Sequence, residues 1–335
     1  MARFESKLKN PYIRITVFAG FFVLFHLMIL GVFYNYVQYQ ANLRYRVDKM
    51  FKAEADTLDH LFIGSSRTNK AIETDSFNHA FKFFGPTETA PYHYYRAKYL
   101  LEHHPYPIRQ IIFPAEYGVL AFNSQPLQYL GLYWKRYIDF AELGMHTNHP
   151  FYYMGLGLKI SIFPYYQHPA GLLVLRDLRK NKVIWRYFQR PSWKNYSPLE
   201  QNMIMAFVLA RHYIFGSLVN PTGVDYFKMM TRLADPAKVQ VVFLKYPLRK
   251  EYYENIGQID PKAVRYNHWI DSLVEATPGA VLLDCMKLYD ERPELFLDPH
   301  HLNKAGKAEF SGWLSDTLNS LLHQFEMNKR GTDIN

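Results

Sequence analysis

The chain has 335 residues, a formal net charge of +9, and an aromatic share of 17 %, so it is long enough for one large or two medium-sized domains. Basic charge suits nucleic acid, an anionic membrane or an anionic polymer. Because the sequence contains no zinc-finger, helix-turn-helix or RNA-binding pattern, nucleic acid is not an expected partner. The single cysteine, Cys285, excludes an intrachain disulfide, and its place after the apolar run Ala280–Leu283 predicts a buried structural thiol.

The first expected element is a membrane anchor. Residues 15–34 are apolar except for Thr16 and His26, and twenty helical residues span roughly 30 Å of hydrocarbon. The run is longer than the apolar core of a cleaved signal peptide, and no small-x-small cleavage site follows it. Four basic residues and one acidic residue precede it, which favours a cytoplasmic N-terminus. We therefore expect residues 1–36 to form a cytoplasmic tail and a single transmembrane anchor, with the globular part outside the cytoplasm. His26 is interpreted as a functional group or, more simply, as a neutral side chain that faces a partner helix.

Beyond the anchor, the pattern predicts a helical stalk over residues 37–57 and then alternating strands and helices. The expected strands are Leu61–Ile63, Phe81–Phe84, Arg109–Phe113, Val239–Leu244 and Ala280–Leu283. The expected helices are about Tyr92–His103, Pro261–Glu275 and a last helix from Asn303, with an apolar face of Phe310, Trp313, Leu314, Leu318, Leu321, Leu322 and Phe325. Apolar strands that alternate with helices predict an α/β three-layer sandwich around a mostly parallel, flavodoxin-like sheet.

The alternation is interrupted in the middle of the chain. We expect residues 58–119 and 236–327 to form the α/β domain, residues 120–235 a helical, aromatic-rich insertion over the active-site edge, and residues 328–335 a tail. The insertion contains Phe163–Tyr166, a basic run from Arg176 to Arg186 and an amphipathic segment from Asn202 to Phe215. The spacing of its histidines fits no common metal site: His146, His149 and His168. Neither a metal nor a cofactor is expected.

Two motifs carry chemistry. Gly64-Ser65-Ser66 follows the first strand, and Asp298-Pro299-His300-His301 precedes the last helix. A serine hydroxyl is a poor nucleophile unless a base takes its proton, and that base needs a third group to fix its tautomer. Asp298 and His301 can supply the base and its orienting group from one turn. The structural alternatives are an N-capped turn at Ser66 and a capping turn or a metal-like cluster at Asp298–His301.

The order of these two motifs along the chain resembles that in the SGNH (GDSL-type) hydrolase superfamily. The resemblance covers about residues 58 to 325. Ser66 takes the position of the nucleophile, with Ser65 where that family usually has an aspartate. The tail Asp298-x-x-His301-Leu302-Asn303-x-x-Gly306 is the closest match, and it implies His301 as the base and Asp298 as its orienting group. The Gly-Ser-Ser variant is similar to membrane-anchored DltD-like and alginate-acetylation proteins, which modify cell-envelope polymers beside a membrane-bound O-acyltransferase.

The resemblance further implies an oxyanion hole. The backbone amides of Ser66 and Gly85 are its expected donors. The family's third donor, an asparagine after the next strand, is missing, because Pro114-Ala115-Glu116-Tyr117 stands there and Asn123 lies too far along the chain. One such donor is worth roughly 10²–10³ in rate. Three residues near the motifs are candidates for substrate contact: Arg67, Glu116 and Asn303.

The sequence thus suggests an extracytoplasmic, membrane-anchored acyl esterase or O-acyltransferase that modifies a cell-envelope polysaccharide. The expected partners are the lipid bilayer, the glycan and a membrane-bound O-acyltransferase. The alternative from another class is a catalytically inactive scaffold that binds glycan or bridges an acyltransferase assembly, which the missing asparagine favours. A lipase that faces the cytosol is a third alternative and depends on topology alone.

Overall fold

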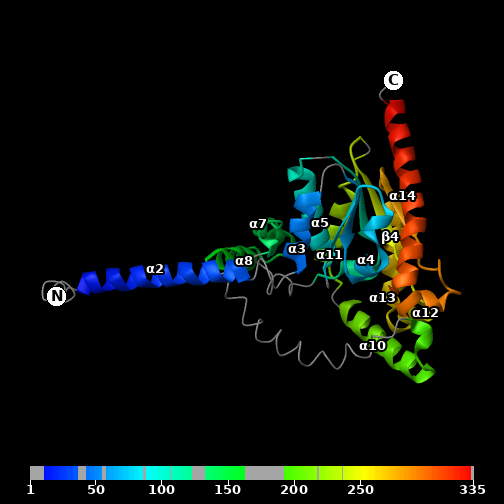
Figure 1. The fold of residues 1–335 in the computed structure, drawn as a ribbon, viewed down its shortest axis with the longest axis horizontal. Helices are drawn as coiled ribbons and strands as arrows, with labels where there is room; N and C mark the ends of the chain where they lie inside the picture. The colour runs from blue at the N-terminus through cyan, green and yellow to red at the C-terminus, as the bar shows by residue number, and fades with distance from the viewer. Residues whose placement is uncertain are drawn as a thin grey trace.

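The N-terminal helix stands apart from a globular α/β body (Figure 1). The computed structural model describes residues 11–36, 43–54, 58–85, 88–105, 107–122, 133–162, 192–216, 219–235 and 237–332. Helix α2 (Pro11–Tyr36) is the one described helix that is long and apolar enough to cross a membrane, with a mean hydropathy of 1.6 over Pro11–Met28 and no burial there. Several segments named above lie outside the described residues: Asn123, Phe163–Tyr166, His168 and Arg176–Arg186.

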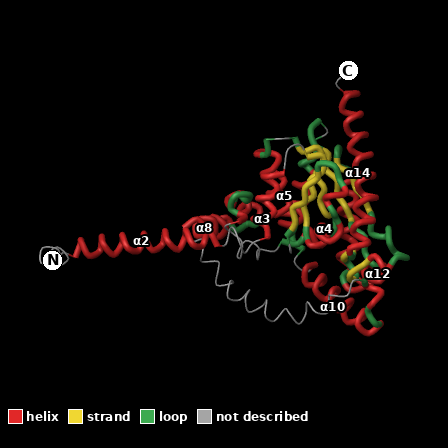
Figure 2. Tube along the Cα trace, viewed as in Figure 1, coloured by secondary structure: helices red, strands yellow, loops and turns green. Residues whose placement is uncertain are grey.

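Five parallel strands form the central sheet (Figure 2). In chain order they are β1 (Leu58–Gly64), β2 (Ala80–Phe84), β3 (Ile108–Pro114), β4 (Gln240–Lys245) and β5 (Ala280–Asp284). Their spatial order is β2-β1-β3-β4-β5, and every neighbouring pair runs parallel. This order is the flavodoxin-like one, so the predicted fold class is confirmed.

Helices cover both faces of the sheet. Along β1, Ile63 points into a cluster with Tyr95 and Tyr226, whereas Phe62 points into a second cluster with Leu314. The first face is covered by α3 (Leu43–Glu54), α5 (Ala90–His103), α11 (Pro221–Thr231) and α13 (Pro261–Glu275). The second is covered by α4 (Ser66–Ala71), α10 (Pro198–Gly216), α12 (Lys250–Ile259) and α14 (Lys304–Thr332). Burial on both faces explains why the strands are continuously apolar.

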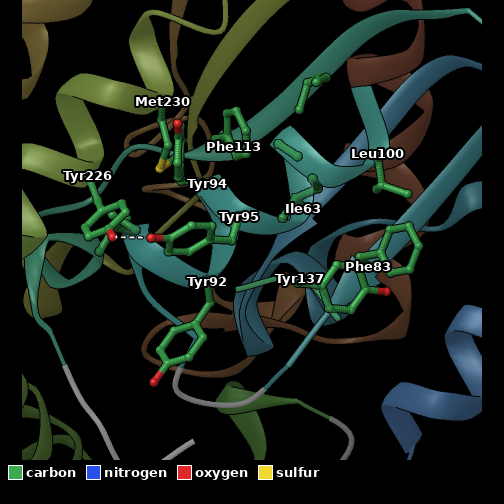
Figure 3. Close-up of a cluster of buried hydrophobic side chains, with 14 of the residues drawn as sticks. Ile63, Phe83, Tyr92, Tyr94, Tyr95, Leu100, Phe113, Tyr137, Tyr226 and Met230 are labelled. Atoms are coloured by element: carbon green, nitrogen blue, oxygen red, sulfur yellow. Dashed lines mark hydrogen bonds between the residues drawn. The ribbon is translucent and has the colours of Figure 1, made fainter. Parts of the chain in front are cut away.

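The first cluster is unusually rich in tyrosine. Figure 3 shows Tyr95 and Tyr226 meeting between α5 and α11, with their hydroxyl oxygens 2.6 Å apart. A buried tyrosine hydroxyl needs a hydrogen-bond partner, and here the two hydroxyls form a hydrogen bond with each other. Phe113 of β3 belongs to the same cluster. Much of the high aromatic content is therefore in the core.

Helix α14 packs one apolar stripe against the sheet. Its buried residues are Phe310, Leu314, Leu318 and Leu322. Trp313 was expected on this face but is 40 % exposed, and it stacks on Phe310 with ring centroids 5.9 Å apart. One residue before Leu314 is about 100° around the helix, so Trp313 lies at the margin of the stripe.

A buried row of polar side chains crosses the same face of the sheet. His60 Nδ1 donates a hydrogen bond to Gln110 Oε1 at 2.7 Å, and His60 Nε2 lies 3.1 Å from the side-chain amide of Asn319 in α14. Gln110 then donates to Gln240 and to the backbone of α14 at Leu318. A one-residue slip of β1, β3 or β4 would leave these groups buried without partners, so the row helps to fix the register.

Helix α3 lies within the segment that we expected to form a helical stalk, and it packs against the domain. Val47 and Phe51 are buried, and the Phe51 ring centroid lies 4.9 Å from that of Phe81 in β2. The buried Asp48 carboxylate accepts a hydrogen bond from Tyr137 at 2.8 Å. It also accepts one from Tyr133 and forms an ion pair with Arg136. Val47 and Phe51 are four residues apart, so they lie on one face of the helix. This apolar face packs against the domain.

The described part of residues 120–235 is helical: α7 (Phe140–His146), α8 (Pro150–Ile162), α10 and α11. Helix α11 is part of the sheet's cover, since Tyr226, Phe227 and Met230 are fully buried. Short elements complete the fold: the 3₁₀ turns η2 (Thr74–Ser76), η3 (Tyr117–Leu120), η5 (Trp193–Asn195) and η6 (Pro293–Leu295), and the strands β6 (Phe296–Asp298) and β7 (His301–Leu302).

Candidate active site

A tight strand-to-helix turn presents Ser66. Strand β1 ends at Gly64 and α4 begins at Ser66, so only Ser65 separates them. A Cβ atom on Gly64 would collide with the side chain of Thr68, whose hydroxyl accepts a hydrogen bond from Tyr246 at 2.9 Å. Glycine is therefore required for this close approach. The turn leaves the Ser66 side chain exposed at the carboxyl end of the sheet, where ligands bind in such folds.

A small antiparallel hairpin presents Asp298 and His301. They are paired residues of β6 and β7, so both side chains lie at one end of the hairpin. Asn303 holds the following helix: its Oδ1 accepts from the Gly306 N–H at 3.0 Å, and its Nδ2 donates to the Glu294 carbonyl at 2.6 Å. These bonds occupy the Asn303 side chain in an N-cap and a loop contact.

Ser66, His301 and Asp298 come together as a continuous hydrogen-bonded chain. His301 Nε2 lies 3.2 Å from Ser66 Oγ, and His301 Nδ1 lies 2.8 Å from Asp298 Oδ2. The other Asp298 oxygen, Oδ1, accepts the backbone N–H of His300 at 3.0 Å. A carboxylate in this position can fix the histidine tautomer that leaves Nε2 free to accept a proton.

The Asp298 carboxylate is buried but stays ionised. Burial alone would raise its pKa, yet attraction to the protonated forms of His301 and then of His300, together with hydrogen bonds, holds the pKa well below its usual range. A carboxylate that remains charged can stabilise an imidazolium as His301 takes up a proton.

A second histidine shares this carboxylate. His300 Nδ1 lies 3.1 Å from Asp298 Oδ1, and the His300 and His301 rings are 3.9 Å apart. Burial, followed by repulsion from His301, lowers the pKa of His300 to about 3, so this ring is neutral. The ligand atoms of the three residues all lie within 4.8 Å of one another, a spacing that a metal ion also uses. Of the two rings, His301 forms a hydrogen bond with Asp298 through Nδ1, whereas His300 Nδ1 has no hydrogen-bond partner among the described residues.

Beside the triad lies a polar cluster that sequence reasoning found only in part. Arg67 forms an ion pair with Glu116, and its guanidinium donates to the Tyr252 hydroxyl at 3.3 Å. His212 of α10 forms a hydrogen bond with Tyr252, and its ring lies 4.7 Å from His300. Burial, then repulsion from His300, lowers the pKa of His212 well below its ordinary value, so this ring is neutral.

Arg67 and Glu116 were expected near the substrate; His212 and Tyr252 were not expected at all. Burial raises the pKa of Tyr252 to about 12, so its hydroxyl stays protonated and can donate. His212 lies in the amphipathic segment that we expected over the active-site edge, but nothing in its local pattern distinguishes it from a surface histidine. Only the crossing of α10 over the carboxyl ends of the strands brings it to the site.

The two expected oxyanion donors differ in their availability. The Gly85 N–H donates to the Gly64 carbonyl at 3.1 Å, which continues the β1–β2 ladder, so this amide is not directed at Ser66. Ser66 is the first residue of α4, and the N–H groups of a first helical turn have no intrahelical acceptor. At the end of β3, Glu116 offers a carboxylate, which accepts hydrogen bonds and cannot replace an asparagine donor.

Comparisons with known proteins add little to this geometry. No protein-family model matches the chain, and no curated protein matches it. A solved structure described as a proposed platelet activating factor from Streptococcus pneumonia is 14 % identical, and the match covers 87 % of this chain and 99 % of that one. Its TM-score of 0.35 is too low to support an inference about fold or function. The class of the protein therefore rests on its own features, an α/β fold with a Ser–His–Asp chain at the carboxyl edge of the sheet.

Proposed function

We propose that the protein is a serine-dependent acyl esterase or O-acyltransferase of the SGNH type. The observation that carries this proposal is the hydrogen-bonded chain from Ser66 Oγ through His301 to Asp298. The exposure of Ser66 supports it, because a bound ester must reach the nucleophile. The early serine turn and the late Asp-x-x-His motif, which the fold brings to one edge of the sheet, support the SGNH assignment.

The reaction follows from the geometry. Ser66 Oγ attacks the carbonyl carbon of an acyl ester while His301 Nε2 takes its proton, and Asp298 stabilises the resulting imidazolium. The C–O bond to the leaving alcohol then breaks, and His301 returns the proton to that oxygen. The acyl-serine passes its acyl group to water in an esterase, or to a hydroxyl of an acceptor in a transferase.

The anchor and the charge suggest where this chemistry occurs. Helix α2 is a candidate span near the N-terminus, and basic residues precede it. We infer that the domain lies outside the cytoplasmic membrane and acts on a cell-envelope polysaccharide, with a membrane-bound O-acyltransferase as the source of acyl groups. The net charge of +9 favours an anionic polymer or lipid surface over a neutral one.

An inactive scaffold is the second candidate, and a specific observation favours it. The Gly85 amide is bonded to Gly64, and Glu116 stands where an asparagine donor is expected. Without these donors the oxyanion depends on the Ser66 amide and on whatever the acceptor or partner contributes. A slow hydrolase that is a competent transferase in its complex agrees with this arrangement, and so does a glycan-binding scaffold.

A fluorophosphonate probe distinguishes the two. The probe reacts with activated serines, so we expect labelling of the full chain in detergent, loss of labelling in Ser66→Ala, and unchanged labelling in the matched variant Ser65→Ala. An unlabelled but folded parent protein would favour the scaffold. Labelling that is lost only in Ser65→Ala would move the nucleophile by one residue.

A further inference from the structure

Helix α8 has two apolar stripes, one on each side. A single stripe would be enough to pack the helix against the domain. Its inward residues are Tyr153, Leu156, Gly157 and Ile160, which contact the core or its margin. Its outward residues repeat the same i, i+3, i+4, i+7 spacing and are all exposed: Phe151, Met154, Gly155 and Leu158. The most exposed residue of this stripe is Phe151, at 89 %. An outward stripe of this kind marks an interaction surface.

The contacts of α8 place it in the part of the domain that is tied to the anchor. Helix α2 ends at Tyr36 and α3 begins at Leu43, and the chain between these two residues reaches at most about 25 Å. The buried Asp48 of α3 holds Tyr137, which lies just before α7, and α7 packs on α8. In Figure 1, α8 lies at the end of the globular body at which α2 arrives.

We propose that the outward stripe of α8 lies in the interfacial layer of the bilayer that α2 crosses, a proposal that rests on the proposed membrane anchor. Thirteen residues at helical rise measure about 20 Å, too short to cross a hydrocarbon core of about 30 Å, so the helix lies in the plane of the interface. Tyr152 and Lys159, seven residues apart, border the stripe on one side of the helix, and both side chains suit a boundary between lipid and water.

Lipid is favoured over a soluble protein as the occupant by position and by charge. The bilayer is already within reach of this end of the domain through α2 and α3. The protein's excess of basic residues, +9 in formal charge, attracts an anionic surface to it. A second attachment point would also fix how the sheet's carboxyl edge faces the membrane, which a single anchoring helix cannot do.

Photolabelling from within the lipid tests this surface. The full chain is reconstituted in vesicles of phosphatidylcholine and anionic phosphatidylglycerol that contain a trace of lipid with a diazirine on its acyl chain. After illumination we expect lipid adducts on peptides of α2 and on residues 150–162, and none on the exposed end of α14. Met154 and Met327 are a matched pair, 53 % and 54 % exposed, so equal labelling of both would overturn the proposal.

The outcomes also separate this surface from the anchor. Adducts on α2 without adducts on α8 would overturn the α8 surface and leave the anchor intact, whereas an unlabelled α2 would overturn the anchor. In Phe151→Ser/Leu158→Ser, which leaves the inward stripe unchanged, labelling of α8 should fall at least about fivefold while labelling of α2 is retained. Protein–protein crosslinks at α8 in place of lipid adducts would assign the stripe to a second copy or a partner, and would also overturn the proposal. Thermal melting of the variant checks that it remains folded.

Discussion

One carboxylate, Asp298, serves two histidines at this site. It bonds His301 through Oδ2 and holds the backbone of His300 through Oδ1. His301 alone connects to Ser66, whereas the neutral His300 ring packs among His301, Tyr252 and His212. The proposed function therefore gives the two adjacent histidines different roles, with His301 in proton transfer and the backbone of His300 in support of the carboxylate.

The first prediction follows from these roles. Asp298→Asn should lower ester hydrolysis or acyl transfer by about 10³–10⁴-fold with the fold intact, because the amide favours the wrong tautomer of His301. His301→Ala should be at least as damaging. His300→Gln should retain activity within about tenfold, since its backbone N–H still reaches Asp298. Turnover by the three purified variants, with circular dichroism as the check of folding, decides this. An active His301→Ala beside an inactive His300→Gln would reverse the two assignments.

The second prediction concerns the ion pair beside Ser66. The Arg67 and Glu116 side chains are only 11 % and 14 % exposed, so Glu116→Gln should leave an uncompensated cation and cost about 3 kcal/mol of stability. Arg67→Met/Glu116→Leu removes both charges and should recover most of that loss. Because Arg67 is already bonded to Glu116 and Tyr252, we expect the double variant to recover activity as well. Denaturant unfolding and turnover test both points, and a stable but inactive double variant would show that Arg67 contacts the substrate.

At the scale of elements, the strands and the two motifs could be predicted from the sequence, because each depends on residues that are close together in the chain. Burial on both faces makes β1, β3 and β4 continuously apolar, and the Asp298-x-x-His301 spacing survives in a hairpin of a few residues. The docking of α3, the cover provided by α11 and the approach of His212 were not readable, since each depends on a surface formed by distant residues. The same holds for the Gly85 amide, whose bond to Gly64 follows from strand pairing.

Helix α5 contains a pH-sensitive element that motif reasoning also missed. His93 is fully buried, and neither ring nitrogen has a hydrogen-bond partner in the part of the chain that the structure describes. Burial lowers its pKa to about 4, with a smaller opposing effect from Glu88. The folded state thus binds this proton less readily than the unfolded state, whose histidine pKa is about 6.5.

The third prediction is a loss of stability as the pH falls from about 6.5 to about 4. In that window the unfolded chain is protonated at His93 and the folded chain is not, which costs about 3 kcal/mol in total at about 1.4 kcal/mol per pKa unit. His93→Met should therefore flatten the dependence of the unfolding free energy on pH. Denaturant melts at pH 7 and pH 5 measure this, and His323→Met, at an exposed histidine of α14, is the control. An unchanged slope in His93→Met would contradict the assignment.

At the scale of the whole molecule, the proposed anchor α2, helix α3 and the proposed α8 surface would together determine how the domain meets the membrane. Helix α3 packs on the domain, and only residues 37–42 separate it from α2. In the proposed anchored state, Ser66 would reach only substrates near the bilayer surface. This reach agrees with an acyl group handed over by a membrane-bound partner.

The fourth prediction is topological. A periplasmic-type reporter such as alkaline phosphatase, fused after Asn335, should be active, because the basic residues before the apolar run at Ile15 favour a cytoplasmic N-terminus. Replacing Arg3, Lys7, Lys9 and Arg14 by Gln should lower that activity by making the orientation mixed. A reporter that works only on the cytoplasmic side would rule out both this topology and the envelope-glycan function.

The order of the strands has a consequence for how the chain is made. Strands β3 and β4 are neighbours in the sheet, yet β4 begins 126 positions after β3 ends, from Pro114 to Gln240. At about 5–20 residues per second, a ribosome delivers β4 roughly 6–25 s after β3. During that interval β2, β1 and β3 can already pair, but the outer edge of β3 carries Ile111, Ile112 and Phe113 without their partner strand. A nascent chain of this kind needs a chaperone or a translocation channel to cover that edge until its neighbour emerges.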